Sequence, residues 1–279
     1  MRRSIFPVAF LALALGACSP VTPATPTATP AGSSSGTPSA SPSATGPAVT
    51  GTPVTCNELS FVVDPTLASS VTCETVPAET YEFAPYPEHT RVTLQGYPII
   101  ASFHEATISV YPVADYAPLM AWAFPALPNE LAALAAGGPA PILAAPFDPV
   151  LPYLPFDEAT QPFFAHYSTI SFGSGDGIRF LTERGQYQVP VNNTDLFYTF
   201  QGLTSDGQYW VSAILPVNHA TLPVDADSAL GGLTWEDWAA NYDAYLPAAV
   251  GDLEAQPSAS FMPSLDALDA LVASITIQP

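Results

Sequence analysis

The sequence predicts an α+β domain, with a central, mostly antiparallel sheet and helices packed against it, preceded by a disordered tether. Three observations predict this class. Short runs of β-branched and aromatic residues alternate with segments of helical periodicity over residues 56–279. Two apolar runs joined through Ser205-Asp206-Gly207 are typical of a β-hairpin. Residues 19–55 carry no charge and almost no apolar bulk, so they cannot form a core.

The first 17 residues have the composition of an export signal. Two arginines precede an apolar run over Ile5–Leu15, which is too short to span a bilayer as a mature helix. The following Leu15-Gly16-Ala17-Cys18 closely resembles the bacterial lipobox. This resemblance implies a lipoprotein signal peptide over residues 1–17 and a palmitate-containing diacylglycerol anchor on the Cys18 thiol. An ordinary secretory signal with an incidental cysteine is the alternative, and both Sec and twin-arginine export stay open.

Residues 18–55 are expected to form the tether. Of the 37 residues after Cys18 in this segment, 34 are Ser, Thr, Pro, Ala or Gly, so burial cannot offset chain entropy. Eight prolines favour extended polyproline II. The tether would therefore hold a single globular domain, residues 56–279, clear of the membrane.

The charge balance excludes two classes of partner. Removal of residues 1–17 leaves three arginines, no lysine and 25 acidic residues, a net charge of −22. Nucleic acids and anionic bilayer surfaces both need clustered Lys and Arg. We therefore expect no nucleic-acid partner, and contact with the membrane through the lipid anchor only.

Two cysteines remain once Cys18 carries lipid. Cys56 and Cys73 both follow the export signal, so they would lie in a compartment that permits disulfides. Their even number predicts one bridge between them.

In the first half of the domain, strands alternate with short helices. Strands are predicted over three segments, Leu59–Val63, Thr90–Tyr97 and Thr107–Tyr111. Asp64-Pro65 provides an N-cap and a first-turn proline for a short helix to about Val71. A longer helical segment is predicted over Tyr116–Gly137. Pro125 and Pro128 would break it, Asn129 would cap the part that follows, and Gly137 would end it.

The second half contains the hairpin and the last helices. Leu196–Gly202 and Gln208–Leu215 are apolar on both faces, which predicts a central position in a sheet covered on both sides. Two further strands are predicted before them, His166–Phe172 and Ile178–Arg184. Thr234 and Asp237 predict a capping box for a helix that carries Trp235, Trp238, Tyr242 and Leu246. Ser264 would cap a final helix with Leu265, Leu268, Leu271 and Val272, followed by a strand over Ser274–Gln278.

Two resemblances bear on the family. The block Gly177–Pro223, with the lipobox and the Ser/Thr/Pro tether, resembles uncharacterised bacterial lipoproteins, which carry no assigned activity. The order of elements, an early strand, a capped short helix and a final helix that leads into a strand, is similar to PsbP-like α+β domains. That similarity implies a binding or accessory module.

No motif for catalysis stands out. The glycines in Gly173-Ser174-Gly175-Asp176-Gly177 adjoin the serine, which does not fit G-x-S-x-G, so this segment is expected to be a turn. The four histidines lack the spacing of a zinc site, and lysine-dependent chemistry is excluded by composition. We expect no cofactor and no bound metal. Carboxylates that converge only in the folded chain leave an extracellular hydrolase as an alternative.

The candidate ligand-facing residues are one arginine and three aromatic residues. Arg179 could bind a carboxylate, although pairing with an acidic residue of the chain is the simpler interpretation. The proline-rich segment Gly137–Phe164 could line a groove for a small hydrophobic ligand or an envelope protein, through Phe147, Tyr153 and Phe156. Alternatively, it covers the core of the sheet.

The expected function is that of a lipoprotein anchored to the outer face of the bacterial cell membrane, presenting a non-catalytic binding or accessory domain. A substrate-capturing lipoprotein of a transport system is a further alternative, but such proteins are usually built from repeated βαβ halves.

Overall fold

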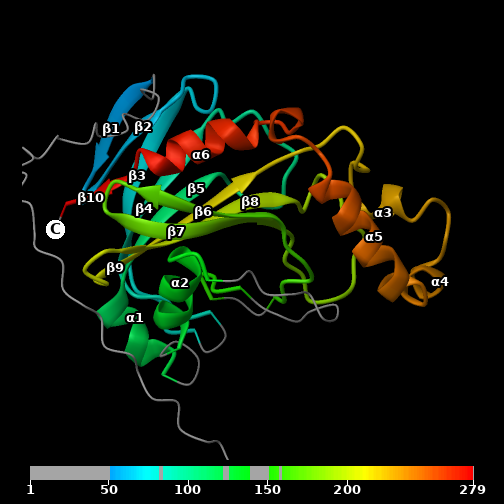
Figure 1. Cartoon of the computed structure of the whole chain (residues 1–279), viewed down its shortest axis with the longest axis horizontal. Helices are drawn as coiled ribbons and strands as arrows, with labels where there is room; N and C mark the ends of the chain where they lie inside the picture. Colours follow the sequence, from blue (N-terminus) through cyan, green and yellow to red (C-terminus); the bar gives the residue numbers. More distant parts are fainter. Residues whose placement is uncertain (1–50, 82–83, 122–125, 139–150, 157–158, 279) are drawn as a thin grey trace, which may run out of the picture. The chain divides into compact units, whose positions relative to one another are not determined.

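A computed structural model of the chain describes residues 51–81, 84–121, 126–138, 151–156 and 159–278. The expected signal peptide, Cys18 and most of the tether lie outside these residues. The described part confirms the α+β class, with a seven-stranded antiparallel sheet in the order β3-β4-β5-β9-β8-β7-β6 (Figure 1). Its strands are β3 (Ser70–Val76), β4 (His89–Gln95), β5 (Thr107–Pro112), β6 (Ala165–Phe172), β7 (Gly175–Thr182), β8 (Phe197–Thr204) and β9 (Tyr209–Pro216). Within the described ranges, no helix is long and apolar enough to cross a membrane.

The predicted hairpin is confirmed as β8 and β9, which pair from Phe197 with Pro216 to Leu203 with Trp210. The turn ends at Gly207, whose φ of 71° favours glycine. Side chains on both faces of the hairpin are buried, because each face of the sheet has its own covering layer. The two strands are therefore central, as their continuous apolar runs predict.

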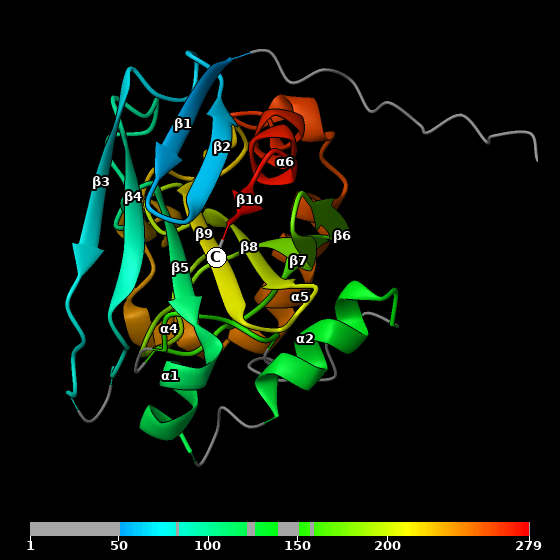
Figure 2. The same cartoon turned by 90° about the vertical axis from the view of Figure 1, so that its left-hand side faces the viewer.

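One face is covered by a second, three-stranded sheet and the last helix (Figure 2). This sheet has the order β1-β2-β10, with β1 (Thr52–Cys56), β2 (Leu59–Val63) and β10 (Thr276–Ile277). Helix α6 (Leu265–Ala273) begins after Ser264, whose side chain accepts from Ala267 N, and its four predicted apolar residues are buried. The cap and the closing strand are thus confirmed, although the strand is shorter than expected.

The beginning of the fold differs from the prediction in two places. The folded part starts at Thr52 rather than Cys56, because β1 pairs along its whole length with β2 and Val54 packs on the core. The helix predicted from Asp64 to about Val71 is wrong. Asp64 caps a single turn, accepting from Thr66 N at 2.8 Å, and Ser70 then pairs with Gln95 to start β3. Tertiary pairing outweighs the local helix signal.

The opposite face is covered by two short helices and residues 151–156. Helix α2 (Leu127–Ala135) packs against β7 and β8, and α1 (Val113–Leu119) packs against β5. The predicted segment from Tyr116 is thus two helices, and the first begins three residues earlier. Asn129 is not the cap, since α2 follows Ala126 with Pro128 in its first turn. Gly137 ends the segment at a φ of 85°, as predicted.

The C-terminal helices lie at one end of the sheet (Figure 1). They are α3 (Ala226–Ala229), α4 (Trp235–Ala239), α5 (Tyr242–Glu254) and the 3-10 turn Ser258–Ser260. Thr234 accepts from Asp237 N at 3.1 Å, which confirms the cap. The expected single helix is divided at Ala240 and Asn241, yet Trp238, Tyr242 and Leu246 are all buried together.

The predicted Cys56–Cys73 disulfide is present, with 5.7 Å between the Cα atoms. It joins the end of β1 to the middle of β3, and so links the two sheets. Replacing both cysteines with serine is expected to lower the free energy of unfolding by about 3 kcal/mol, because the bridge restricts the unfolded chain. Urea denaturation of the oxidised protein and the Cys56→Ser/Cys73→Ser variant measures the difference, with reduced wild-type protein as control. Equal midpoints for all three would contradict this role.

Candidate functional site

The candidate site is a surface hollow of about 550 Å³, which we call the aromatic hollow. Four segments form it: the loop after β3, the loop after β4, Ala159 in the segment before β6, and the loop between β7 and β8. Its volume lies within the range of roughly 300–1,000 Å³ that is typical of ligand pockets. The side chains that line it include Tyr81, Phe103, Arg184, Gln186, Tyr187 and Asp195.

Three aromatic rings of the hollow are exposed to solvent. Tyr81 is 57% exposed, Phe103 is 75% exposed and Tyr187 is 70% exposed. These are three of the most exposed large apolar side chains in the described part of the chain. Scattered single apolar residues on a surface are normal, but a group around one hollow is typical of a binding site.

Hydrogen bonds between the loops hold the walls of the hollow. Phe103 N donates to Thr194 O at 2.9 Å, and Ser102 Oγ donates to the same oxygen at 3.2 Å. On the other side, Arg184 Nη2 donates to Ala159 O at 2.8 Å, and its guanidinium stacks 4.2 Å above the centre of the Tyr153 ring. The loop after β4 and the segment at Ala159 are therefore both fixed to the loop between β7 and β8.

A buried acid lies behind the loop that carries Asp195. Glu183 is 1% exposed, and its Oε1 accepts from Asn192 N at 2.7 Å. Asn192 Nδ2 in turn donates to Asp195 Oδ2 at 2.8 Å. Burial raises the pKa of Glu183 well above its ordinary value, and the nearby Asp195 carboxylate raises it further. Glu183 thus supports the loop through Asn192 and is not among the residues that line the hollow.

This burial predicts a pH-dependent stability. Between about pH 4.5, its ordinary pKa, and its raised folded pKa, Glu183 keeps a proton in the folded state that the unfolded state has lost. Its contribution to the free energy of unfolding therefore falls as pH rises through this window. Glu183→Gln keeps the acceptor for Asn192 N without the titration.

We expect the stability of Glu183→Gln relative to wild type to increase as pH rises from about 4.5 toward the raised folded pKa of Glu183, by up to about 1.4 kcal/mol per pH unit. Chemical denaturation at several pH values measures the difference. Asp269, with a raised pKa, and His89 and His219, with lowered pKa values, are present in both proteins, so they cancel. A difference that is constant with pH would contradict a raised Glu183 pKa.

Arg179 lies away from the aromatic hollow. It is 8% exposed; its Nε is 3.2 Å from Asp269 Oδ1 of α6, and Nη1 donates to His166 O. Asp269 Oδ1 also accepts from Tyr198 Oη at 3.0 Å. Of the two interpretations of this arginine, the structure shows the ion pair within the chain, which ties α6 to the sheet.

The aromatic residues of the proline-rich segment that were predicted to face a ligand pack against the core instead, where the structure describes them. Tyr153 is 6% exposed beneath Arg184. Phe156 is half-buried and packs against the core cluster that contains Phe180 and Trp210. Leu151 and Leu154 of the same segment are also buried there. Phe147 lies outside the described residues. The residues described between 151 and 164 thus cover the sheet, which was the alternative to a ligand groove.

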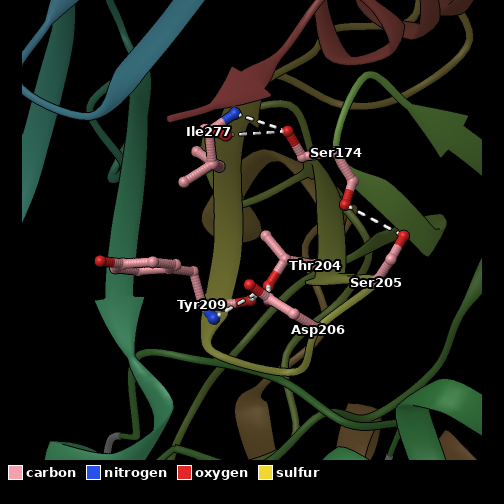
Figure 3. A pocket seen from close by; sticks show the side chains of 6 residues that line it. All are labelled: Ser174, Thr204, Ser205, Asp206, Tyr209 and Ile277. Atoms are coloured by element: carbon pink, nitrogen blue, oxygen red, sulfur yellow. Dashed lines mark hydrogen bonds between the residues drawn. The ribbon is translucent and has the colours of Figure 1, made fainter. Parts of the chain in front are cut away.

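A smaller hollow of about 240 Å³ lies beside the turn between β6 and β7 (Figure 3). Ser174 in it donates from Oγ to Ile277 O at 3.2 Å and accepts from Ile277 N at 2.7 Å. Ser205 Oγ donates to Ser174 O. None of the described residues that line this hollow is a histidine. Ser174 joins β10 to the large sheet. The turn is shorter than predicted, because residues 175–177 already belong to β7 and pair with β6.

One serine and one histidine do meet, but in a geometry unsuited to nucleophilic catalysis. His219 Nε2 is 2.9 Å from Ser260 Oγ. Thr221 N donates to His219 Nδ1 at 3.3 Å, and Thr221 Oγ1 lies 2.8 Å from the same nitrogen. Ser260 Oγ donates to Pro257 O at 2.7 Å. The serine proton is thus directed at a backbone carbonyl, whereas a nucleophilic serine would give its proton to the imidazole.

The described residues contain no group of three or more His, Cys, Asp or Glu side chains placed to hold a metal ion. Comparisons with protein-family models, with curated proteins and with solved structures find no match to this chain.

Proposed function

We propose that this chain is a lipoprotein anchored to the outer face of the bacterial cell membrane, and that its domain binds an envelope component through the aromatic hollow. The group of exposed aromatic side chains around one hollow carries the proposal. Exposure of the Phe103 and Tyr187 rings to water costs free energy. A ligand that covered these rings would remove that cost, which favours binding.

The sequence supports the location. A lipobox-like segment that ends at Cys18 and an uncharged proline-rich tether precede the domain. A lipid on Cys18 and roughly 35 residues of tether would let the hollow sample the layer above the membrane. The domain is accordingly proposed to act by binding, as an accessory module rather than an enzyme.

Site-specific photocrosslinking in cells tests the binding surface. A benzophenone amino acid in place of Phe103 or Tyr187 is expected to form ultraviolet-dependent adducts with an envelope component. The same amino acid in place of Ile100, which is 94% exposed in the same loop as Phe103, is the matched control and should form few. Equal adducts at all three positions, or none at any, would contradict the proposal.

An activity assay tests the non-catalytic part. Purified protein is expected to leave peptide, ester and glycan substrates unchanged. Turnover that disappears on substitution of one acidic residue or one serine would show an enzyme instead.

A further inference from the structure

We infer that the aromatic hollow binds a neutral saccharide. The inference rests on the proposed function, because it names the ligand class of the same hollow. Three properties of the lining support it: exposed aromatic faces, polar groups held toward the hollow, and a local balance of charge.

The aromatic faces match the apolar side of a sugar ring. A pyranose presents C–H groups on its faces and hydroxyls around its edge, so it packs flat against an aromatic side chain. Phe103 and Tyr187 come from different loops of the hollow and are each at least 70% exposed. Tyr187 is held by an edge-on contact with Trp235 of α4, with 6.4 Å between ring centroids, so its orientation is restricted before a ligand binds.

Polar groups of the wall match the hydroxyls. Asp195 Oδ2 is held by Asn192, which is fully buried, while Oδ1 makes no hydrogen bond within the described part of the chain. Gln186 is exposed and its amide likewise has no partner among the described residues. A carboxylate oxygen accepts and an amide both accepts and donates, which suits hydroxyls that do both.

Charge separates a neutral saccharide from other ligands. The mature chain has a net charge of −22 and Asp195 lines the hollow, so an anionic ligand would be repelled. Arg184 lines the same hollow, so a cation would lie beside a like charge there, against the attraction of the overall negative charge. A wholly apolar ligand would remove Asp195 Oδ1, which has no partner among the described residues, from water, and this is costly. An uncharged ligand with many hydroxyls meets none of these penalties.

The test uses full-length protein extracted from membranes in a detergent without a sugar headgroup. The probes are neutral oligosaccharides of glucose, galactose, mannose and arabinose, with oligogalacturonates as anionic and chitosan oligomers as cationic controls. Titration calorimetry is expected to detect a neutral oligosaccharide. Phe103→Ala and Tyr187→Ala should each weaken that binding at least tenfold, whereas Ile100→Ala should change it less than twofold. The melting temperatures should stay unchanged, because all three side chains are exposed.

The outcomes separate the ligand class from the proposed function. Preference for a charged oligosaccharide, or equal weakening by Ile100→Ala, would overturn the saccharide inference. Binding of no oligosaccharide would also overturn it, and adducts that persist at Phe103 and Tyr187 would then show that the hollow binds a different class. The absence of those adducts would instead count against the proposed function itself.

Discussion

Replacing Cys18 with Ala is expected to move the protein from the membrane fraction to the soluble extracytoplasmic fraction and to abolish its labelling by a palmitate analogue. The thiol is the proposed acceptor of the diacylglycerol, and none of the helices that the structure describes could cross the bilayer. A net charge of −22 repels an anionic surface, whereas two acyl chains are enough for stable anchoring. The expected effect is therefore nearly complete.

Fractionation and metabolic labelling of cells that produce each variant measure this result. The Cys56→Ser/Cys73→Ser protein is the control, since it keeps Cys18 and should label like wild type. Wild-type protein that takes up no label in cells would contradict the lipobox interpretation, and the anchoring argument would fail with it.

Gln201→Leu is expected to destabilise the domain more than loss of the disulfide does. Gln201 is fully buried in β8. Its Oε1 accepts from Trp210 Nε1 at 2.7 Å and from Leu154 N at 3.0 Å, and its Nε2 donates to Ser212 Oγ at 3.0 Å. Leucine removes an acceptor from two buried donors. Each such loss costs about 1–3 kcal/mol, so at the middle of this range the two together lower the free energy of unfolding by about 4 kcal/mol.

Guanidinium denaturation followed by tryptophan fluorescence measures this decrease. Gln208→Leu is the matched control, because Gln208 lies in the same hairpin with an exposed side chain, and its effect should stay within about 0.5 kcal/mol. A decrease below about 1 kcal/mol for Gln201→Leu, the lower bound for one unsatisfied buried donor, would mean that these hydrogen bonds do not hold residues 151–156 on the sheet.

Local signals in the sequence are sufficient for the centre of the fold. The Asp-Gly turn and the doubly apolar runs predict β8 and β9, and Ser264 and Thr234 predict two helix starts. The errors arise where partners distant in sequence decide the structure. Residues 52–55 have the composition of a tether but form a strand because β2 offers a paired edge. The turn after Asp64 stops short because β3 pairs with β4.

The aromatic hollow could not be predicted in the same way. Tyr81, Phe103 and Tyr187 lie on three loops, and no periodicity relates them. Glu183 and Arg184 follow directly after β7, which ends at Thr182. Arg184 lines the hollow, whereas Glu183 is buried. A different feature does leave a signal in the sequence. Gln201 is an isolated glutamine within the apolar run over Leu196–Gly202, and it holds residues 151–156 on the sheet through its hydrogen bonds with Leu154.

The disulfide also determines how the domain would respond to a pulling force. A chain held at Cys18 transmits tension from the membrane to the domain at Thr52, the first residue of β1. Because β1 is at the edge of its sheet, a pull could separate it from β2 one residue at a time. The Cys56–Cys73 bridge stops this separation after four residues and transfers the load to β3 of the seven-stranded sheet. The domain would then yield only a short extension under shear from the layer above the membrane, and the loops of the aromatic hollow would remain in place.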